Sequence, residues 1–451
     1  MWEFILSILG GALDILIHIL PVLKKTNFYK RFKNIHWHKC LHSSEKINEY
    51  VSKINFKDLG RTKQLDGKNL IDKYKEDMHE MTICDSNNNI RTIQIPYLEL
   101  INFNKHPNTE IIISSSKENP LSLNREFKLS EKMENATRKV LDYVLKNNPK
   151  TTNDPHTRLA SLKQIGKNKY ECVLEKTFYH TQIKTNLSMD YRLKINGFRK
   201  SMRDLEKEQH MLEQEEWKEN KILNDALHPN CLASLENSLL ANVIGVSAIW
   251  CMEDEDDEEP VFYLMPRNNK VGVYKNKLGM PSGDIEIPEY PRKNKEEQNH
   301  FRDKSLIEFL KWEIAREFAE ETGIADKNRK LEDYSVEITK SKNRNKKPNE
   351  KKITDEEFIK YYTEMEIIPL ALTREMIRGG KPQMFFLIKT KKIPQNDLEK
   401  CFRSSLGNEE FDNPKKWWSW TTATISSEVA CNYLYAMEHI QGRKDGIICL
   451  R

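Results

Sequence analysis

The sequence predicts an α+β protein with a mixed β-sheet in its C-terminal domain, a mixed α/β middle region and one N-terminal transmembrane helix. Three features support this prediction: an apolar run at the N-terminus, short apolar runs separated by turns in the C-terminal half, and a carboxylate-bearing helix at 316–324. The predicted divisions are residues 1–25, 26–234 and 235–451. A chain of 451 residues has room for roughly two or three domains.

The composition is that of a globular protein with many solvated faces, since 38% of the residues are hydrophobic and 31% are charged. Its 73 basic and 68 acidic residues give a net charge of +5. This balance is too even for a protein that coats nucleic acid, so we expect no stable DNA or RNA partner. Eight cysteines without a C-x-x-C pair favour a reducing compartment.

Residues 4–23 form an almost continuous apolar run. A helix of that length spans about 30 Å, the thickness of the hydrocarbon core of a bilayer. Basic side chains follow the run directly, at Lys24, Lys25, Lys30, Arg31 and Lys33. Because basic flanks stay in the cytoplasm, we expect a single-pass protein of the inner membrane, with its N-terminus outside and its soluble part cytoplasmic.

One face of this apolar helix is polar or small, because Ser7, Gly10, Asp14 and His18 recur every three or four residues. Ionisable groups inside a bilayer are costly and usually face protein or water. The stripe therefore predicts contact between helices of a homo-oligomer within the lipid bilayer. Two alternatives remain open: an amphipathic helix that lies in the membrane interface, and a monomeric anchor that tolerates Asp14.

The middle region, 26–234, carries no motif that assigns a chemistry. The segments 90–101 and 110–113 have strand character, and 129–145 has helical character. The segment 201–220 is highly charged, which predicts a solvated connecting helix.

Apolar runs at 239–250 and 261–265 in the C-terminal half are typical of buried strands. Another strand is predicted at 384–388, after a turn at 378–382 that contains two glycines. A last helix is predicted from about Ser427, because Val429, Tyr433, Ala436 and Ile440 fall on one of its sides.

The segment from Arg316 to Ile324 reads Arg-Glu-Phe-Ala-Glu-Glu-Thr-Gly-Ile. Its carboxylates Glu317, Glu320 and Glu321 have the three- and four-residue spacing that places side chains on one helix face. The glycine at 323 suits a left-handed helix end. Such a face offers the oxygen ligands that Mg²⁺ needs when it also holds phosphate. The alternative is an ordinary acidic surface helix.

These residues resemble the core of the Nudix box, G-x5-E-x7-R-E-U-x-E-E-x-G-U, where U is a bulky apolar residue. Every specified position from Arg316 to Ile324 fits, and Glu308 fits the upstream glutamate. The position of the box glycine is Arg302, so the better equivalent is Gly283. That assignment implies an insertion near 287–305, and a lysine-rich segment near 340–352 is a second one.

The resemblance implies an α-β-α sandwich around a mixed sheet for residues 235–451. It also implies a cofactor, Mg²⁺ or Mn²⁺, with Glu317, Glu320 and Glu321 as metal ligands. Glu317, Glu320 and Arg316 would be the catalytic residues in the hydrolysis of a phosphoanhydride. The expected nucleotide-binding residues are the loop Gly283, Asp284 and Glu286, and the aromatic group Trp417, Trp418 and Trp420.

The combination of an apolar N-terminal helix with this domain resembles the transmembrane–Nudix effectors of bacterial CBASS anti-phage signalling. The resemblance implies a membrane-anchored effector that binds a nucleotide signal, a cyclic oligonucleotide, and oligomerises to disrupt the membrane. The alternative is a membrane-tethered, Mg²⁺-dependent Nudix hydrolase that cleaves a phosphoanhydride of a nucleoside diphosphate derivative. The polar stripe favours the first hypothesis, and the intact carboxylate set favours the second.

Overall fold

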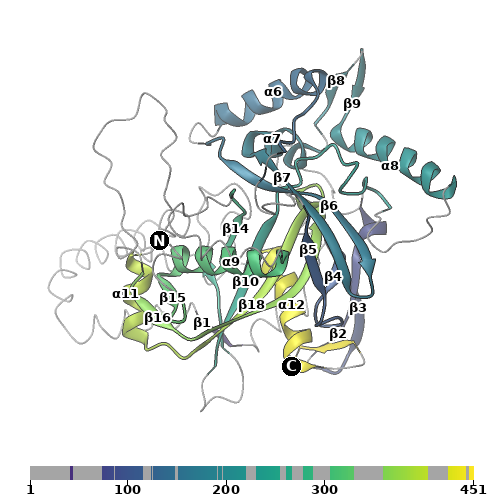
Figure 1. The fold of residues 1–451 in the computed structure, drawn as a ribbon. Coiled ribbons are helices and arrows are strands. Elements are labelled where there is room, and N and C mark those ends of the chain that lie inside the picture. The colour runs from purple at the N-terminus through teal and green to yellow at the C-terminus, as the bar shows by residue number, and fades with distance from the viewer. Residues whose placement is uncertain are drawn as a thin grey trace, which may run out of the picture.

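The computed structural model describes residues 41–43, 74–85, 87–114, 123, 125–147, 151–189, 191–195, 197–219, 230–253, 261–266, 278–287, 305–329, 359–404, 425–442 and 446–450. Strands are the main elements in these ranges (Figure 1). They form one seven-stranded sheet, two three-stranded sheets and three two-stranded sheets.

The seven-stranded sheet has the order β1-β11-β10-β18-β17-β4, and β14 also pairs with β10. It is mixed, because β10 and β18 run parallel while the other pairs are antiparallel. Its strands are β1 (Leu41–Ser43), β4 (Tyr97–Asn102), β10 (Gly245–Glu253), β11 (Val261–Tyr263), β14 (Ser282–Asp284), β17 (Met365–Glu375) and β18 (Lys381–Lys391).

The core lies on both faces of this sheet, since successive residues of a strand point to opposite sides. On β10, Val246 and Trp250 belong to the cluster that includes helix α9 (Leu306–Thr322). Ile249 belongs to the cluster that includes helix α12 (Ser427–Gln441). The ring of Trp250 meets that of Phe318 from α9 at 5.2 Å between centroids. Each fully buried side chain of this size contributes roughly 1.5–3 kcal/mol to stability.

The ends of α9 follow from its sequence. The side chain of Ser305 accepts a hydrogen bond from the backbone N–H of Glu308, which caps the first turn. Gly323 ends the helix with φ 75°, in the left-handed region that glycine adopts without steric cost. The predicted left-handed end is confirmed, and so is the helix from Ser427, which begins after the cap Ser426.

Smaller sheets and further helices surround the seven-stranded sheet. The three-stranded sheets are β19-β2-β3 and β5-β7-β6, with β2 (His79–Cys84), β3 (Ile90–Ile95), β5 (Glu110–Ile113), β6 (Pro155–Gly166), β7 (Lys169–Phe178) and β19 (Ile447–Cys449). The two-stranded sheets pair β8 (Leu193–Ile195) with β9 (Phe198–Lys200), β12 (Met265–Pro266) with β13 (Leu278–Gly279), and β15 (Ile324–Asp326) with β16 (Tyr361–Thr363). The other α-helices are α6 (Glu131–Asn147), α7 (Tyr179–Lys184), α8 (Met202–Glu219) and α11 (Gln395–Ser404).

The predicted fold class was wrong. It placed an α-β-α sandwich of Nudix type in residues 235–451, whereas the described chain is built largely of mixed β-sheets. The seven-stranded sheet also takes β1 and β4 from the N-terminal half of the chain. Pairing between strands so far apart is set by tertiary contacts and leaves no local sequence pattern.

The transmembrane helix in that prediction is corrected as well. None of the helices in the described ranges is long and apolar enough to cross a membrane. Residues 1–25, with the stripe Ser7, Gly10, Asp14 and His18, lie outside those ranges.

Candidate functional site

Helix α9 gathers carboxylates around the guanidinium of Arg316, which is 7% exposed. The Nη2 atom of Arg316 lies 2.7 Å from Oε1 of Glu317 and 3.2 Å from Oε2 of Glu313. Its Nη1 atom donates to Oε1 of Glu320 at 2.8 Å. One planar, always-charged fork therefore holds three carboxylates of the same helix in fixed orientations.

The carboxylates outnumber the positive charge at this point, which makes the cluster electronegative. Burial raises the pKa of Glu317 above its ordinary value, although Arg316 opposes the shift. The nearby charges of Glu320, Glu313 and Glu286 raise the pKa of Glu317 further. Keeping all these groups ionised is costly without another cation, so the cluster favours a bound positive ion.

Strand β14 places its Gly283 against helix α9. A Cβ atom on Gly283 would lie 2.5 Å from the Cδ atom of Glu317 and 2.6 Å from its Oε2 atom. Those distances are shorter than side-chain contacts allow, so any larger residue at 283 would require the Glu317 carboxylate to move. The structure therefore places two residues predicted from separate parts of the motif directly against each other.

The other predicted residues take different positions. Glu321 is buried, and Glu286 is exposed with its backbone bridged to His156 of β6. Asp284 forms an ion pair with Lys381, whose Nζ atom lies 2.6 Å from Oδ1 of Asp284. Trp417, Trp418 and Trp420 lie outside the described residues.

Glu308, whose spacing fits the upstream glutamate of the box, belongs to the start of α9. Its backbone N–H donates to the Ser305 cap, and its carboxylate pairs with Lys311 at 3.0 Å. Its side chain is 66% exposed, unlike that of Glu317 at 15%. Glu308 therefore belongs to the capped first turn of the helix, and the ion pairs of Arg316 are formed with Glu313, Glu317 and Glu320.

Lys381 was not predicted as a site residue, and it is fully buried beside Asp284. Burial alone would raise the pKa of Asp284, but the charges of Lys381 and Arg378 lower it to about 2. Burial lowers the pKa of Lys381, and Arg378 lowers it further. Both pKa values are lowered, but for different reasons: at Asp284 the neighbouring positive charges outweigh burial, whereas at Lys381 burial and Arg378 together outweigh the charge of Asp284. The only sequence signal was a lysine directly after the turn glycines at 379–380.

No preformed metal cage is present among the residues that the structure describes, in the sense of three His, Cys, Asp or Glu side chains converging on one point. Arg316 connects the carboxylates instead. The donor set nevertheless fits Mg²⁺ or Mn²⁺, because it is electronegative and offers oxygen ligands. A carboxylate bound to Arg316 through one oxygen still has a second oxygen with which it can coordinate a cation.

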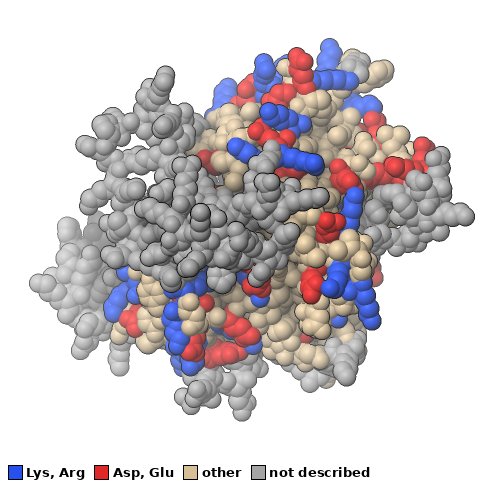
Figure 2. All heavy atoms as spheres, viewed as in Figure 1, with Lys and Arg blue, Asp and Glu red and all other residues tan. Residues whose placement is uncertain are grey.

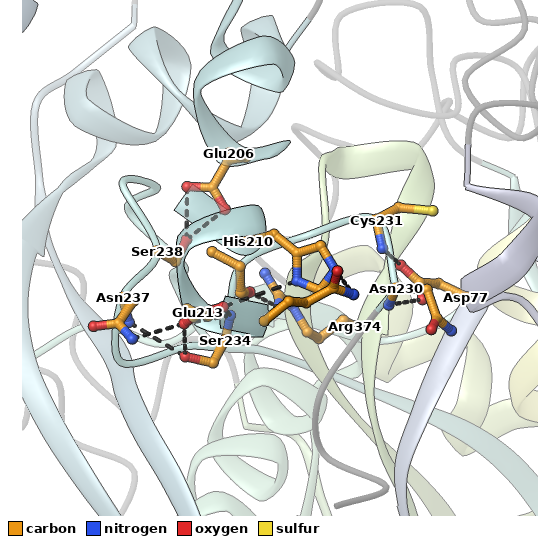
Figure 3. A network of polar contacts seen from close by, with 12 residues as sticks. Asp77, Glu206, His210, Glu213, Asn230, Cys231, Ser234, Asn237, Ser238 and Arg374 are labelled. Carbon is orange, nitrogen blue, oxygen red and sulfur yellow. Dashed lines mark hydrogen bonds and ion pairs between the residues drawn. The ribbon is translucent and has the colours of Figure 1, made fainter. Parts of the chain in front are cut away.

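A second buried polar cluster joins α8 to the loop 230–239 (Figure 3). Glu213 accepts hydrogen bonds from Ser234 Oγ at 2.5 Å and from Asn237 Nδ2 at 2.7 Å. Glu206 accepts one from the backbone N–H of Leu239 at 2.5 Å. Arg374 of β17 donates to the carbonyl oxygen of Ala233 at 2.8 Å. These contacts hold the loop in place, which is a structural role.

This second cluster also changes the interpretation of α8. The sequence predicted a solvated connecting helix at 201–220, but Glu206, His210 and Glu213 are at most 3% exposed. The charged composition of α8 therefore gave no sign that one of its polar faces is buried and hydrogen-bonded to the rest of the fold.

Acidic and basic side chains are intermixed on the face of the molecule drawn in Figure 2, rather than gathered by sign.

Comparison with known proteins adds no assignment: no protein-family model matches the chain, and no curated protein matches it significantly.

Proposed function

We propose that this protein hydrolyses a phosphoanhydride bond in a nucleoside diphosphate derivative, with a divalent cation bound at the carboxylate face of α9. The observation that carries the proposal is the Arg316 cluster placed directly against Gly283. An electronegative group of partly buried carboxylates beside a partly buried glycine is suited to hold a cation together with phosphate oxygens. The likeness of residues 316–324 to the Nudix box supports the substrate class.

Each residue has a distinct role in this proposal. Glu317, Glu320 and Glu321 would hold Mg²⁺ or Mn²⁺. When bound, the cation supplies an activated water and neutralises charge on the phosphate oxygens. Arg316 keeps Glu317 and Glu320 oriented through contacts at 2.7 and 2.8 Å.

The loop at 283–286 contributes its backbone. Gly283 lets the chain approach the Glu317 carboxylate more closely than any other residue type would. Glu286 adds a further negative charge that raises the pKa of Glu317, so cation binding and ionisation of Glu317 are coupled.

The test is incubation of the full chain with Mg²⁺ or Mn²⁺ and a panel of linear nucleotides, nucleoside diphosphate derivatives and cyclic oligonucleotides. Products are separated by chromatography, and binding is measured on the same samples. We expect metal-dependent hydrolysis of a diphosphate derivative, and loss of that hydrolysis in the double variant Glu320→Gln, Glu321→Gln. Undiminished cleavage by a folded double variant would refute the site.

The same panel addresses the effector hypothesis, which stays a prediction because residues 1–25, on which it depends, lie outside the described residues. Binding of a cyclic oligonucleotide with no product formed would support a binding module in place of a hydrolase.

A further inference from the structure

Lys381 begins β18 with a fully buried side chain. A buried ammonium is costly unless a carboxylate and hydrogen-bond acceptors surround it. The Nζ atom of Lys381 lies 2.6 Å from Oδ1 of Asp284 and 3.2 Å from Oε1 of Gln383. Asp284 belongs to β14, which lies on the other side of β10 from β18.

Gly245 of β10 leaves room for the Lys381 side chain to reach from β18 across β10 to Asp284 on β14. It is the register partner of both Asp284 and Gln383. A Cβ atom on Gly245 would lie 2.1 Å from Lys381 Nζ and 2.1 Å from Gln383 Oε1. The ends of two side chains therefore fill the space that any other residue type would occupy with its own Cβ.

The ion pair and the carboxylate cluster lie on opposite faces of the sheet. On β18, Lys381 and Gln383 share the side of Phe385, which packs in the cluster with α12. Gln383 also donates to Glu428 of α12 at 3.1 Å. Gly283, the neighbour of Asp284, faces Glu317 of α9. Lys381 therefore influences the carboxylate cluster indirectly, through its ion pair with Asp284 and the backbone of β14.

We infer that Lys381 is a positioning residue of the proposed site, which anchors Asp284 on one face of the sheet so that the Gly283 backbone stays against Glu317 on the other. The inference rests on the proposed function. Loss of the pair would free β14 to shift, and Gly283 with it, while the nucleotide-facing side chains would remain unchanged.

Three variants disturb the pair in different ways. Lys381→Met removes the ammonium, Asp284→Asn removes its partner, and Gly245→Ala keeps both charges but displaces the ends of Lys381 and Gln383. The matched control is Lys184→Met, which removes another buried lysine whose Nζ lies 2.5 Å from Glu134. That pair joins α7 to α6, and neither helix carries a residue of the site.

The measurements are Mn²⁺ affinity by calorimetry on the full chain, and kcat and KM with saturating metal. We expect each of the three variants to bind Mn²⁺ at least about tenfold more weakly, with the nucleotide KM unchanged in Lys381→Met and Gly245→Ala. The double variant Lys381→Met, Asp284→Asn should be no weaker than the weaker single variant, because both residues act through one contact. Lys184→Met should keep the wild-type Mn²⁺ affinity.

The outcomes separate the two proposals. Absence of Mn²⁺ binding by the wild-type chain would overturn the proposed function and this inference together. Wild-type binding that the folded variants retain would overturn the inference alone, as would additive losses in the double variant. If Lys381→Met does not fold, Gly245→Ala and Asp284→Asn decide the question by the same measurements.

Discussion

The carboxylate of Glu317 lies so close to Gly283 that a Cβ on residue 283 would be 2.5 Å from the Glu317 Cδ atom. Glu317 could relieve such an overlap only by leaving Arg316, because the Nη2 atom of Arg316 holds its carboxylate at 2.7 Å. The backbone of β14 and the carboxylate of α9 therefore form one unit.

The first prediction concerns this contact. Gly283→Ala should push Glu317 away from its position and lower the rate of metal-dependent hydrolysis by about a hundredfold, since small displacements at a site have effects of that order. The matched control is Gly166→Ala, where the added Cβ would make only an ordinary contact at 3.6 Å with Lys169 Cβ. Equal rates for both alanine variants would contradict the role assigned to Gly283.

A second prediction separates Glu317 from Glu308, two glutamates of the same helix that both fit the motif spacing. Glu317→Gln should abolish hydrolysis, because a neutral amide cannot replace a carboxylate as a metal ligand. Glu308→Gln should leave the rate within about twofold of wild type, since its side chain is 66% exposed at the helix start. A comparable loss in both variants, measured under saturating Mg²⁺, would place Glu308 in the site.

The third prediction concerns Arg316. Lys in its place keeps the charge but cannot bond three carboxylates with one planar group. Arg316→Lys should therefore lower the free energy of unfolding by about 2–4 kcal/mol, measured with urea, because buried ion pairs are costly to break. The control is Lys311→Met, which removes a pair with Glu308 at the exposed start of the helix and should cost at most about 0.5 kcal/mol. Similar losses in the two variants would show that Arg316 contributes no more than a surface pair.

The fourth prediction is a pH dependence that arises at Glu206. Burial raises the pKa of Glu206 from 4.5 to about 7, although Arg374 opposes the shift. The folded state therefore binds more protons than the unfolded state between these two values. The stability contributed by the protonated carboxyl is complete below about pH 4.5 and is lost as the pH rises through about 7.

Glu206→Gln cannot ionise, so it provides the reference for this effect. The free energy of unfolding of the wild type relative to Glu206→Gln should fall by on the order of 3 kcal/mol as the pH rises across that window. The measurement is urea unfolding of both proteins at several pH values from 5 to 8. A difference that stays constant with pH would contradict the prediction.

Short-range features were predictable because their causes lie within a few residues. The end of α9 at Gly323, the turn that contains the glycines at 379–380 and the start of α12 after Ser426 each depend on local backbone conformation and capping. The spacing of Glu317, Glu320 and Glu321 likewise placed carboxylates on one turn of a helix. The sequence alone therefore determined the helix and its acidic residues.

Other features were decided by tertiary structure. Asp284 received its partner Lys381 only because β14 and β18 flank β10 at Gly245. The addition of β4 to β17 and the burial of Glu206 in a charged helix have the same origin. Strand pairing and ion-pair burial join groups that are far apart in the chain, and their free energy depends on desolvation and packing that no local pattern records. For that reason the carboxylates were found from the sequence, while the elements that position them were found only in the folded chain.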